Sequence, residues 1–231
     1  MKSTDRIYSS SIKISQEEIS YKYRYSRKAI HLRLQISRGN ELEVILPRGY
    51  ELKEAENFIL AKSDWIKKHL HSRSVKEKNY YYFGSEIKVE QEFALFIKKH
   101  NIHFERNTLK IISPEDSTIE LEILYNAWLK NHAKNYLQER TSELAHQFDF
   151  RINKVTVRGQ KTRWGSCSAR GNISFNYMLL KYRKEIIDYV IIHELCHLKE
   201  MNHSKYFWAL VEKFCPSFNN LRKELKGKNN F

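Results

Sequence analysis

Short segments in which apolar and polar residues alternate dominate the first half of the chain. In the clearest, residues 19–25, an isoleucine and three tyrosines occupy every second position, with Lys22 and Arg24 between them. This alternation is typical of a β-strand with one buried face. Residues 1–17 form a polar lead-in in which only Ile12–Ile14 suggests a strand. Further strand-like segments occur at residues 30–36, 42–46, 80–83, 87–89, 93–98 and 109–112.

Two stretches have the helical period instead. Residues 51–71 carry apolar side chains three and four positions apart and predict one helix within the β-rich region. Pro114 and the acidic residues after it are a helix start signal, and the periodic run extends from about Ser117 to Phe148. We therefore place a domain boundary here, with a β-rich N-terminal region at residues 1–113 and a second domain at residues 114–231.

The second domain continues with two predicted strands and further helices. The strands lie at residues 152–160 and 171–176, and a loop at residues 163–168 separates them. Apolar residues at helical spacing, Ile186, Ile187, Val190 and Ile191, then predict a helix with a buried face. A packed helix is also expected around residues 206–211. Together with the first half of the chain, this order predicts an α+β fold.

Composition narrows the class of protein. Hydrophobic residues make up 41% of 231, enough for a substantial core, and seven Gly with three Pro argue against long linkers. Three cysteines without a Cys-x-x-Cys pair are typical of a reducing compartment. The N-terminus lacks the apolar segment of a signal peptide, and no apolar run is long enough for a membrane span. We expect a soluble cytoplasmic protein that does not contact a membrane.

The net charge of +14 at pH 7 favours polyanionic partners. It permits weak association with nucleic acid through a basic surface. Alternatively, a Lys-rich composition simply covers a solvated surface with positive charge. The charge alone does not distinguish these two interpretations.

The strongest chemical signal is His193-Glu194-x-x-His197, followed by His203. Residues four apart on a helix lie on one face, so His193 and His197 can reach the same ion. A catalytic zinc uses three protein ligands plus a water, and His203 supplies a third imidazole if the chain turns back after Glu200. Glu194 lies about 100° around the helix, where it can hold that water. Cys196 points away from the histidine face and is expected to pack.

Together with motifs on either side, these residues resemble a known family. The segment from Val155 to Phe214 resembles the YgjP-like metallopeptidases, zincins related to the SprT-like proteins. The resemblance rests on Arg163-Trp164-Gly165-Ser166-Cys167-Ser168, Ile173-Ser174-Phe175-Asn176, the His-Glu-x-x-His motif and Asn202-His203-Ser204. It extends to most of the chain from about Ile19. The spacing from His197 to His203 equals that of metzincins, but Glu200 stands where metzincins need glycine, and no Met-turn is evident.

The resemblance implies a zincin-like catalytic core. It implies one zinc ion held by His193, His197 and His203, with Glu194 as the catalytic base. Zincins bind substrate along an edge strand, and we expect residues 173–176 to be that strand. The expected substrate-binding residues are Arg163, Trp164, Ile173, Asn176 and Tyr206, of which Arg163 and Tyr206 are candidate oxyanion donors. Trp164 could equally well pack in the core, and Arg163 could pair with a carboxylate.

The sequence therefore predicts a zinc metallopeptidase that cleaves peptide bonds by Glu-assisted attack of a zinc-bound water on the carbonyl of a protein or peptide substrate. Two alternatives keep the metal site. One is a nucleic-acid-associated SprT-like protease, which the positive charge permits. The other is a hydrolase acting on a nucleotide phosphoanhydride, although no Gly-rich phosphate loop is present. A purely structural zinc is disfavoured, because only three ligands are evident and a glutamate adjoins them.

Overall fold

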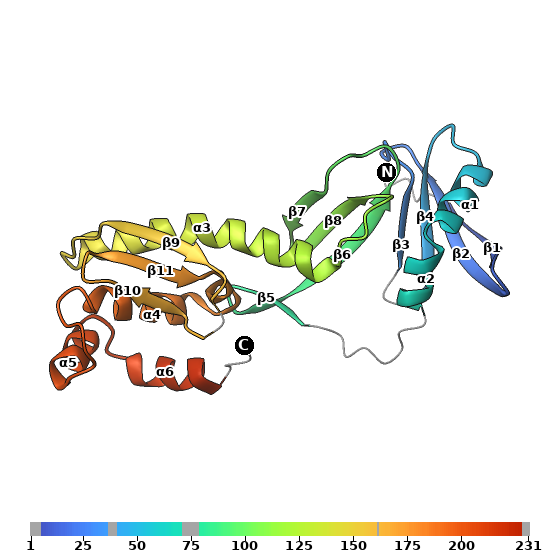
Figure 1. Ribbon diagram of the computed structural model, residues 1–231. Helices are drawn as coiled ribbons and strands as arrows, with labels where there is room; N and C mark the ends of the chain where they lie inside the picture. Colours follow the sequence, from blue (N-terminus) through green and yellow to red (C-terminus); the bar gives the residue numbers. More distant parts are fainter. Residues whose placement is uncertain (1–5, 37–40, 71–78, 161, 228–231) are drawn as a thin grey trace. The chain divides into compact units, whose positions relative to one another are not determined.

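The computed structural model describes residues 6–36, 41–70, 79–160 and 162–227 (Figure 1). The chain forms two compact units. The first unit comprises Met1–Lys78 and Lys88–Leu121, and the second comprises Asn79–Ile87 and Glu122–Phe231. The switch at residues 121–122 lies close to the boundary expected at residue 113, but residues 79–87 belong to the second unit.

The first unit is built on one mixed sheet. Its strand order is β1-β2-β4-β3-β6-β8-β7, in which β2 with β4 and β6 with β8 run parallel and the other neighbours antiparallel. The strands are β1 (Ile7–Ile14), β2 (Glu17–Ser26), β3 (Arg33–Ile36), β4 (Leu42–Pro47), β6 (Ser85–Ala94), β7 (Asn101–Glu105) and β8 (Thr108–Pro114). A β-rich region was predicted, and it is observed.

Two details of this unit differ from the prediction. The supposed polar lead-in is the eight-residue strand β1, which pairs along its whole length with β2. The expected single helix is two, α1 (Leu52–Ala61) and α2 (Ser63–Leu70). The chain leaves helical geometry at Lys62, whose φ of −105° and ψ of 16° end α1. Lys62 is buried, and its Nζ lies 4.1 Å from the centroid of the Phe93 ring. Phe58, Ile59 and Ile66 from these helices join the core.

The second unit contains a small sheet of strand order β10-β11-β9. The strands are β9 (Lys154–Arg158), β10 (Gly165–Cys167) and β11 (Asn172–Asn176); β11 runs antiparallel to β10 and parallel to β9. A hairpin of β5 (Tyr80–Tyr82) with the start of β6 belongs to the same unit. Its helices are α3 (Leu121–Gln147), η1 (Tyr177–Lys181), α4 (Lys184–Cys196), α5 (Lys205–Phe214) and α6 (Phe218–Gly227).

The prediction that residues 173–176 form an edge strand is wrong. Strand β11, which contains Ile173 and Asn176, is the central strand and pairs on both sides. It therefore has no free edge to accept another strand. The cause is β10, three residues that the sequence analysis assigned to a loop. The edge strands of this sheet are β10 and β9, and the side chain of Gln138 donates to the Val155 carbonyl of β9 (3.2 Å).

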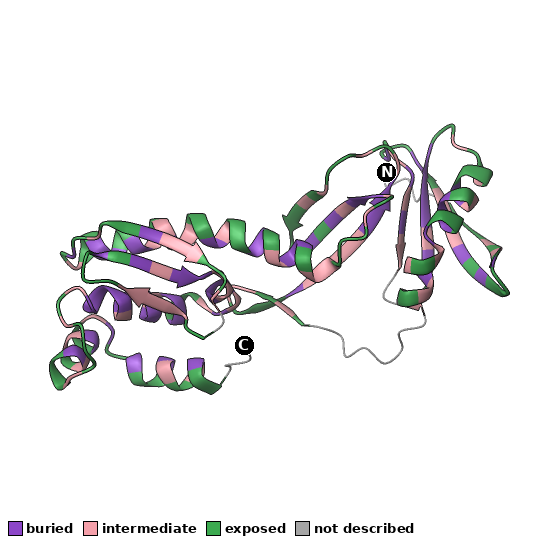
Figure 2. Ribbon diagram, viewed as in Figure 1, coloured by how far each residue is buried: buried purple, intermediate pink, exposed green. Residues whose placement is uncertain are grey.

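Helix α4 is buried nearly all around, as expected for a helix apolar on every face (Figure 2). It is tied to α3 by a bidentate ion pair in which Arg140 Nε and Nη2 donate to Asp188 Oδ1 and Oδ2, both at 2.8 Å. Fork-to-fork pairing fixes orientation as well as distance. Helix α4 is thus held rigidly at the point where its last turn presents His193 and Glu194.

Candidate metal centre

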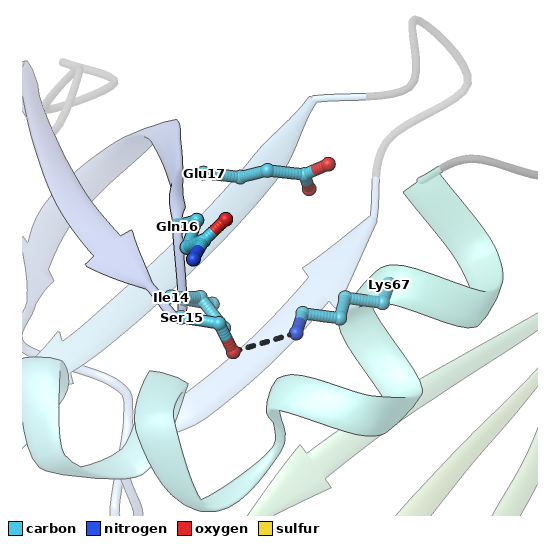
Figure 3. Close-up of a pocket in the computed structure, with 5 residues that line it drawn as sticks. All are labelled: Ile14, Ser15, Gln16, Glu17 and Lys67. Atoms are coloured by element: carbon cyan, nitrogen blue, oxygen red, sulfur yellow. Dashed lines mark hydrogen bonds between the residues drawn. The ribbon is translucent and has the colours of Figure 1, made fainter.

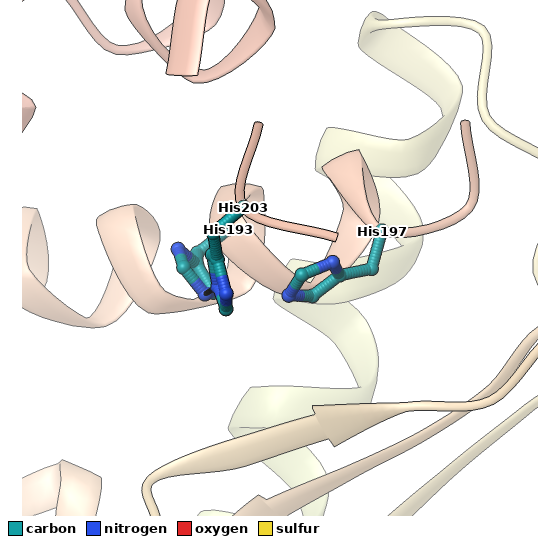
Figure 4. Close-up of side chains that lie close together, drawn as sticks. All are labelled: His193, His197 and His203. Carbon is teal, nitrogen blue, oxygen red and sulfur yellow. Dashed lines mark hydrogen bonds between the residues drawn. The ribbon is translucent and has the colours of Figure 1, made fainter. Parts of the chain in front are cut away.

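The three histidines of the motif meet at the end of α4 (Figure 4). His193 lies in the last turn, His197 is the C-cap, and His203 ends the following loop, directly before the N-cap Ser204 of α5. Their ligand-forming atoms all lie within 4.8 Å of one another, and no other such group of three is found in the part of the chain that the structure describes. The turn after Glu200 that the sequence required is present.

Hydrogen bonding and ring stacking orient the imidazoles. His197 Nδ1 lies 3.0 Å from the Glu200 carbonyl oxygen, and because a carbonyl only accepts, Nδ1 donates and Nε2 keeps its lone pair in the neutral ring. His193 Nε2 and His203 Nε2 are 3.0 Å apart. Phe207 stacks on His197 (4.5 Å between centroids) and Trp208 on His203 (5.5 Å). The rings therefore present nitrogens to one shared point.

Burial favours the neutral form of two of these rings, His193 and His203. Burial lowers the pKa of His193 to about 3, helped by the charges of His197, His203 and Arg222. Burial also lowers the pKa of His203. Neutral imidazole is the form that binds a metal, and a set of three nitrogens suits zinc. The residues present therefore fit a divalent metal ion. Burial raises the pKa of the neighbouring Cys196 thiol to about 12, so this group packs as a neutral side chain.

Glu194 lies beside the histidines, pressed against strand β10. It is 5% exposed, and its Oε2 finds no hydrogen-bond partner within the described residues. Burial raises the pKa of Glu194 to about 8, and the charge of Arg163 opposes that rise. A Cβ added at Gly165 would lie 2.6 Å from Glu194 Oε1, closer than real Cβ contacts. The carboxylate thus packs on the bare backbone of β10, which only glycine permits.

The main-chain groups of β10 divide between its two sides. Asn176 donates its N–H to the Trp164 carbonyl (2.8 Å), and Ser168 donates to the Asn172 carbonyl (3.0 Å). In an antiparallel pair, hydrogen bonding alternates along the strand. Residues 164, 166 and 168 therefore face β11, and the N–H and C=O groups of Gly165 and Cys167 face the open edge. The edge strand next to Glu194 is β10, not β11.

The five residues predicted to bind substrate fall into different environments. Arg163 is exposed and close enough to Glu194 to affect its pKa. Trp164 is half-buried and packs edge-to-face against Tyr182 (5.1 Å). Tyr206 is 65% exposed on α5, with Lys205 Nζ 5.2 Å from its ring centroid. The structure brings Arg163 and Trp164 to the start of β10, beside Glu194.

The other two residues are internal. Ile173 is 1% exposed and Asn176 is fully buried. The side chain of Asn176 accepts from Met178 N (3.0 Å) and donates to the Gln160 carbonyl (2.8 Å) and the Arg163 carbonyl (3.5 Å). Asn176 therefore holds the segment that leads into β10 and does not face the open edge. The sequence analysis missed the role of Gly165; the only signal was a glycine within an otherwise side-chain-rich motif.

The first unit has a hollow of its own, at the turn between β1 and β2 (Figure 3). It encloses about 400 Å³ and is lined by Ile14, Ser15, Gln16, Glu17 and Lys67. Lys67 Nζ donates to Ser15 Oγ (2.8 Å). The lining contains neither histidine nor cysteine, and nothing in it resembles the cluster on α4.

Comparisons with known proteins identify a family. The family model described as "YgjP-like, metallopeptidase domain" matches residues 30–228. Abylysin of Pyrococcus abyssi, a metallopeptidase zymogen, is similar at 25% identity and a TM-score of 0.37, covering 40% of this chain and 94% of its own. The metallopeptidase zymogen jannalysin of Methanocaldococcus jannaschii is similar at 19% identity and a TM-score of 0.35, covering 40% and 95%.

No curated protein has a significant match to the sequence. Within the described residues, none of the helices has both the length and the apolar character needed to cross a bilayer.

Proposed function

The chain belongs to the YgjP-like metallopeptidase family, and from that premise we propose that it is a zinc-dependent peptidase whose catalytic base is Glu194. The observation that carries the proposal is the convergence of His193, His197 and His203 within 4.8 Å, next to a buried carboxylate of α4 that packs against an edge strand. This is a zincin-like arrangement, in which metal ligands, base and substrate-binding strand come from adjoining elements.

The three imidazoles would hold one zinc ion. When bound, zinc polarises the scissile carbonyl and lowers the pKa of a coordinated water from 15.7 to about 7. The chain prepares the site by keeping the His193 ring neutral through burial and by fixing His197 through the Glu200 carbonyl. Such outer contacts orient ligands in known metal sites.

Glu194 would move the proton. Its carboxylate accepts a proton from the attacking water and passes it to the leaving amine. A base whose pKa lies near neutrality suits both halves of this transfer. In the absence of metal, burial raises the pKa of Glu194 to about 8, and a cation at the three histidines would bring it down. The Gly165 backbone fixes where that carboxylate can lie.

Strand β10 would align the substrate. An extended peptide can add to its open edge through the N–H and C=O groups of Gly165 and Cys167. Main-chain hydrogen bonds of this kind bind peptides irrespective of their sequence. They also place the scissile bond beside Glu194, because Gly165 contacts both. Arg163 remains a candidate oxyanion donor near Glu194, and Tyr206 a second on α5.

The test is zinc content and peptide cleavage measured on the same preparations. We expect about one zinc per wild-type chain, the same in Glu194→Gln, and much less in His203→Ala. His146→Ala, a variant of an exposed histidine at the end of α3, is the matched control and should keep its zinc. Only wild type and this control should cleave an unfolded protein substrate.

Two results would contradict the proposal. Full activity in Glu194→Gln would remove the assigned base, and equal zinc content in His203→Ala and His146→Ala would remove the third ligand. The same preparations are also given a nucleoside triphosphate. Turnover of that compound without peptide cleavage would make the protein a phosphohydrolase, since activated water attacks either electrophile.

A further inference from the structure

The second unit also has a hollow, which lies next to the start of β10. It encloses about 490 Å³, within the range of small-molecule and side-chain sites. Its wall includes Tyr81, Trp164, Met178 and Tyr182, together with Arg183 and Glu224. All of these residues belong to one compact unit. Three aromatic rings and a thioether make up the apolar half of its lining, and polar groups, among them Lys181, Arg183 and Glu224, supply the other half.

The position of Trp164 connects this hollow to the candidate active site. Trp164 immediately precedes Gly165, the residue against which Glu194 packs. Successive residues of a strand are about 3.3 Å apart, so the Trp164 wall of the pocket begins close to Glu194. Arg183, on the far wall, is the N-cap of α4 and lies about 16 Å along the helix axis from Glu194. Trp164 is fixed there, because its carbonyl accepts from Asn176 N (2.8 Å) and its ring packs on Tyr182.

The opposite wall is equally fixed. Phe83 of the β5–β6 turn donates its N–H to the Leu180 carbonyl (2.7 Å). Gly84 in that turn has a φ of +81°, and a Cβ there would lie 2.9 Å from the Arg183 backbone nitrogen. The turn therefore packs directly on the start of α4. A pocket with two anchored walls is preformed, as specificity pockets usually are.

The charges at the pocket are largely compensated. Arg183 Nη2 donates to Glu224 Oε2 (2.8 Å), and Arg183 Nη1 donates to Glu185 Oε2 (3.1 Å). Lys181 also lines the pocket, with its Nζ 5.5 Å from the centroid of the Tyr125 ring. Arg183 is shared between two carboxylates, so its charge gives the pocket little preference for an acidic ligand. Its aromatic walls favour a large neutral side chain.

We propose that this pocket is a specificity subsite that receives an aromatic or large aliphatic side chain of the peptide substrate, a few residues from its scissile bond. The inference rests on the proposed function, since the substrate is taken to lie along β10. A peptide that continues along the open edge past Glu194 would bring a side chain a few residues from the scissile bond to the Trp164 wall of the pocket. The main chain of β10 then supplies affinity, and the Trp164 pocket selects the residue.

The experiment measures binding separately from cleavage. Labelled peptides of one host sequence, with Ala, Leu, Phe, Glu or Lys at a single position, are titrated into the zinc-loaded Glu194→Gln protein and followed by fluorescence anisotropy. The position is scanned along the host peptide. We expect Phe and Leu at one position to bind at least about tenfold tighter than Ala, Glu or Lys, the usual discrimination of an apolar pocket.

Variants assign this preference to the pocket. Trp164→Ala and Tyr81→Ala, made in the same background, should reduce the preference to less than about threefold. Tyr81→Ala is included because Tyr81 is 36% exposed and its truncation spares the core. Tyr25→Ala, which removes a 38% exposed tyrosine of the first unit, is the matched control and should keep the full preference.

Equal affinities across the peptide set, or a preference that survives in both pocket variants, would overturn the inference. Cleavage by zinc-loaded wild type is measured in parallel. Selective binding without any cleavage would support the subsite and refute the peptidase proposal. Cleavage without selective binding would refute the subsite and support the peptidase proposal, so the failure of one proposal is distinguishable from the failure of the other.

Discussion

At the scale of single residues, the site depends on contacts that leave little freedom. His197 is fixed by the Glu200 carbonyl, and Glu194 is held against the backbone of Gly165. Residue types and spacing were enough to predict the His-Glu-x-x-His cluster, because a helix puts positions four apart on one face. They could not predict the Gly165 contact, which joins two residues 29 positions apart in the sequence and depends on how β10 meets α4.

Gly165→Ala should inactivate the protein without removing its metal. The added Cβ would lie 2.6 Å from Glu194 Oε1 and 2.7 Å from Glu194 Cγ, so the carboxylate has to move. Misplacement of a base by about 1 Å lowers the rate by about 100-fold. The three atoms nearest this Cβ all belong to Glu194, which is not a metal ligand, so zinc content should stay at the wild-type level. Cleavage rate and zinc content are measured on one preparation.

Gly159→Ala serves as the control for this substitution. Its Cβ would meet only the Tyr177 ring, at 3.2 Å, well away from Glu194. This variant should retain activity close to wild type. An active Gly165→Ala protein would show that Glu194 does not need the bare backbone of β10.

The buried carboxyl of Glu194 predicts the pH dependence of stability in the metal-free protein. Burial raises the pKa of Glu194 from 4.5 to about 8, so its contribution to stability is fully present below pH 4.5 and is lost as the pH rises through 8. Glu194→Gln does not titrate. The free energy of unfolding of the variant, relative to wild type, should therefore rise by about 4 kcal/mol between pH 5 and pH 8.

The neighbouring histidine acts in the opposite direction. Burial lowers the pKa of His193 from 6.5 to about 3, so its contribution is present above pH 6.5 and is lost as the pH falls through 3. Because His193 is common to both proteins, its effect cancels in the difference. Urea unfolding of both chelator-treated proteins at several pH values measures this difference. If the free energies of unfolding of wild type and Glu194→Gln change with pH in the same way, Glu194 is not a buried, protonated group.

At the scale of elements, the long periodic segments were the predictable ones. Helix α3 was expected at residues 117–148 and is observed at Leu121–Gln147. The short strand β10 was not predicted, because three residues, one of them glycine, carry no alternation to detect. Its partner is nearby in sequence, but only the pairing shows that it displaces β11 from the edge. Only Ile12–Ile14 of strand β1 was suggested by the sequence, for a related reason: four of its eight residues are serine or lysine.

The proposed role of strand β10 as the substrate-binding edge can be tested by removing one backbone hydrogen-bond donor. Cys167→Pro removes an N–H that faces the open edge, a position where proline is tolerated in strands. It should weaken substrate alignment and lower kcat/KM by about tenfold, the value of one hydrogen bond. Cys167→Ala keeps the N–H and should remain near wild type.

Kinetics and thermal unfolding are measured on both cysteine variants. Wild-type kcat/KM in a folded Cys167→Pro protein would exclude β10 as the edge that pairs with substrate. The thiol itself is not needed for this role, because burial raises the pKa of Cys167 to about 11 and keeps it neutral.

At the scale of the whole molecule, two features bear on function. The net charge of +14 keeps weak nucleic-acid association as a prediction, to be measured as binding that falls steeply with salt. The second feature is the division into units. The sequence placed the boundary at a proline and acidic cluster near residue 114, where the period changes. It gave no sign that residues 79–87 belong with the second unit, since their partners lie more than 40 residues further along the chain.

Because residues 79–87 belong to the second unit, we expect the domain predicted at residues 114–231 to be incomplete. Tyr125 donates its hydroxyl to the Tyr81 carbonyl (2.7 Å), and the Tyr82 ring lies 4.9 Å from that of Trp128. Their loss should leave apolar surface of α3 and the Leu180 carbonyl uncovered. The fragment 114–231 should therefore be less stable by about 3 kcal/mol or more than a fragment in which residues 79–87 are joined to 122–231, the range found for losing one packed aromatic ring.

A linker of ten Gly and Ser residues, which spans about 17 Å on average, makes that junction. Thermal unfolding followed by circular dichroism compares the two fragments, and zinc content reports whether the histidine site forms. If both fragments unfold at the same temperature and bind the same amount of zinc, β5 is dispensable. If only the joined fragment unfolds cooperatively and binds zinc, the metal centre depends on a hairpin that precedes the predicted domain in sequence.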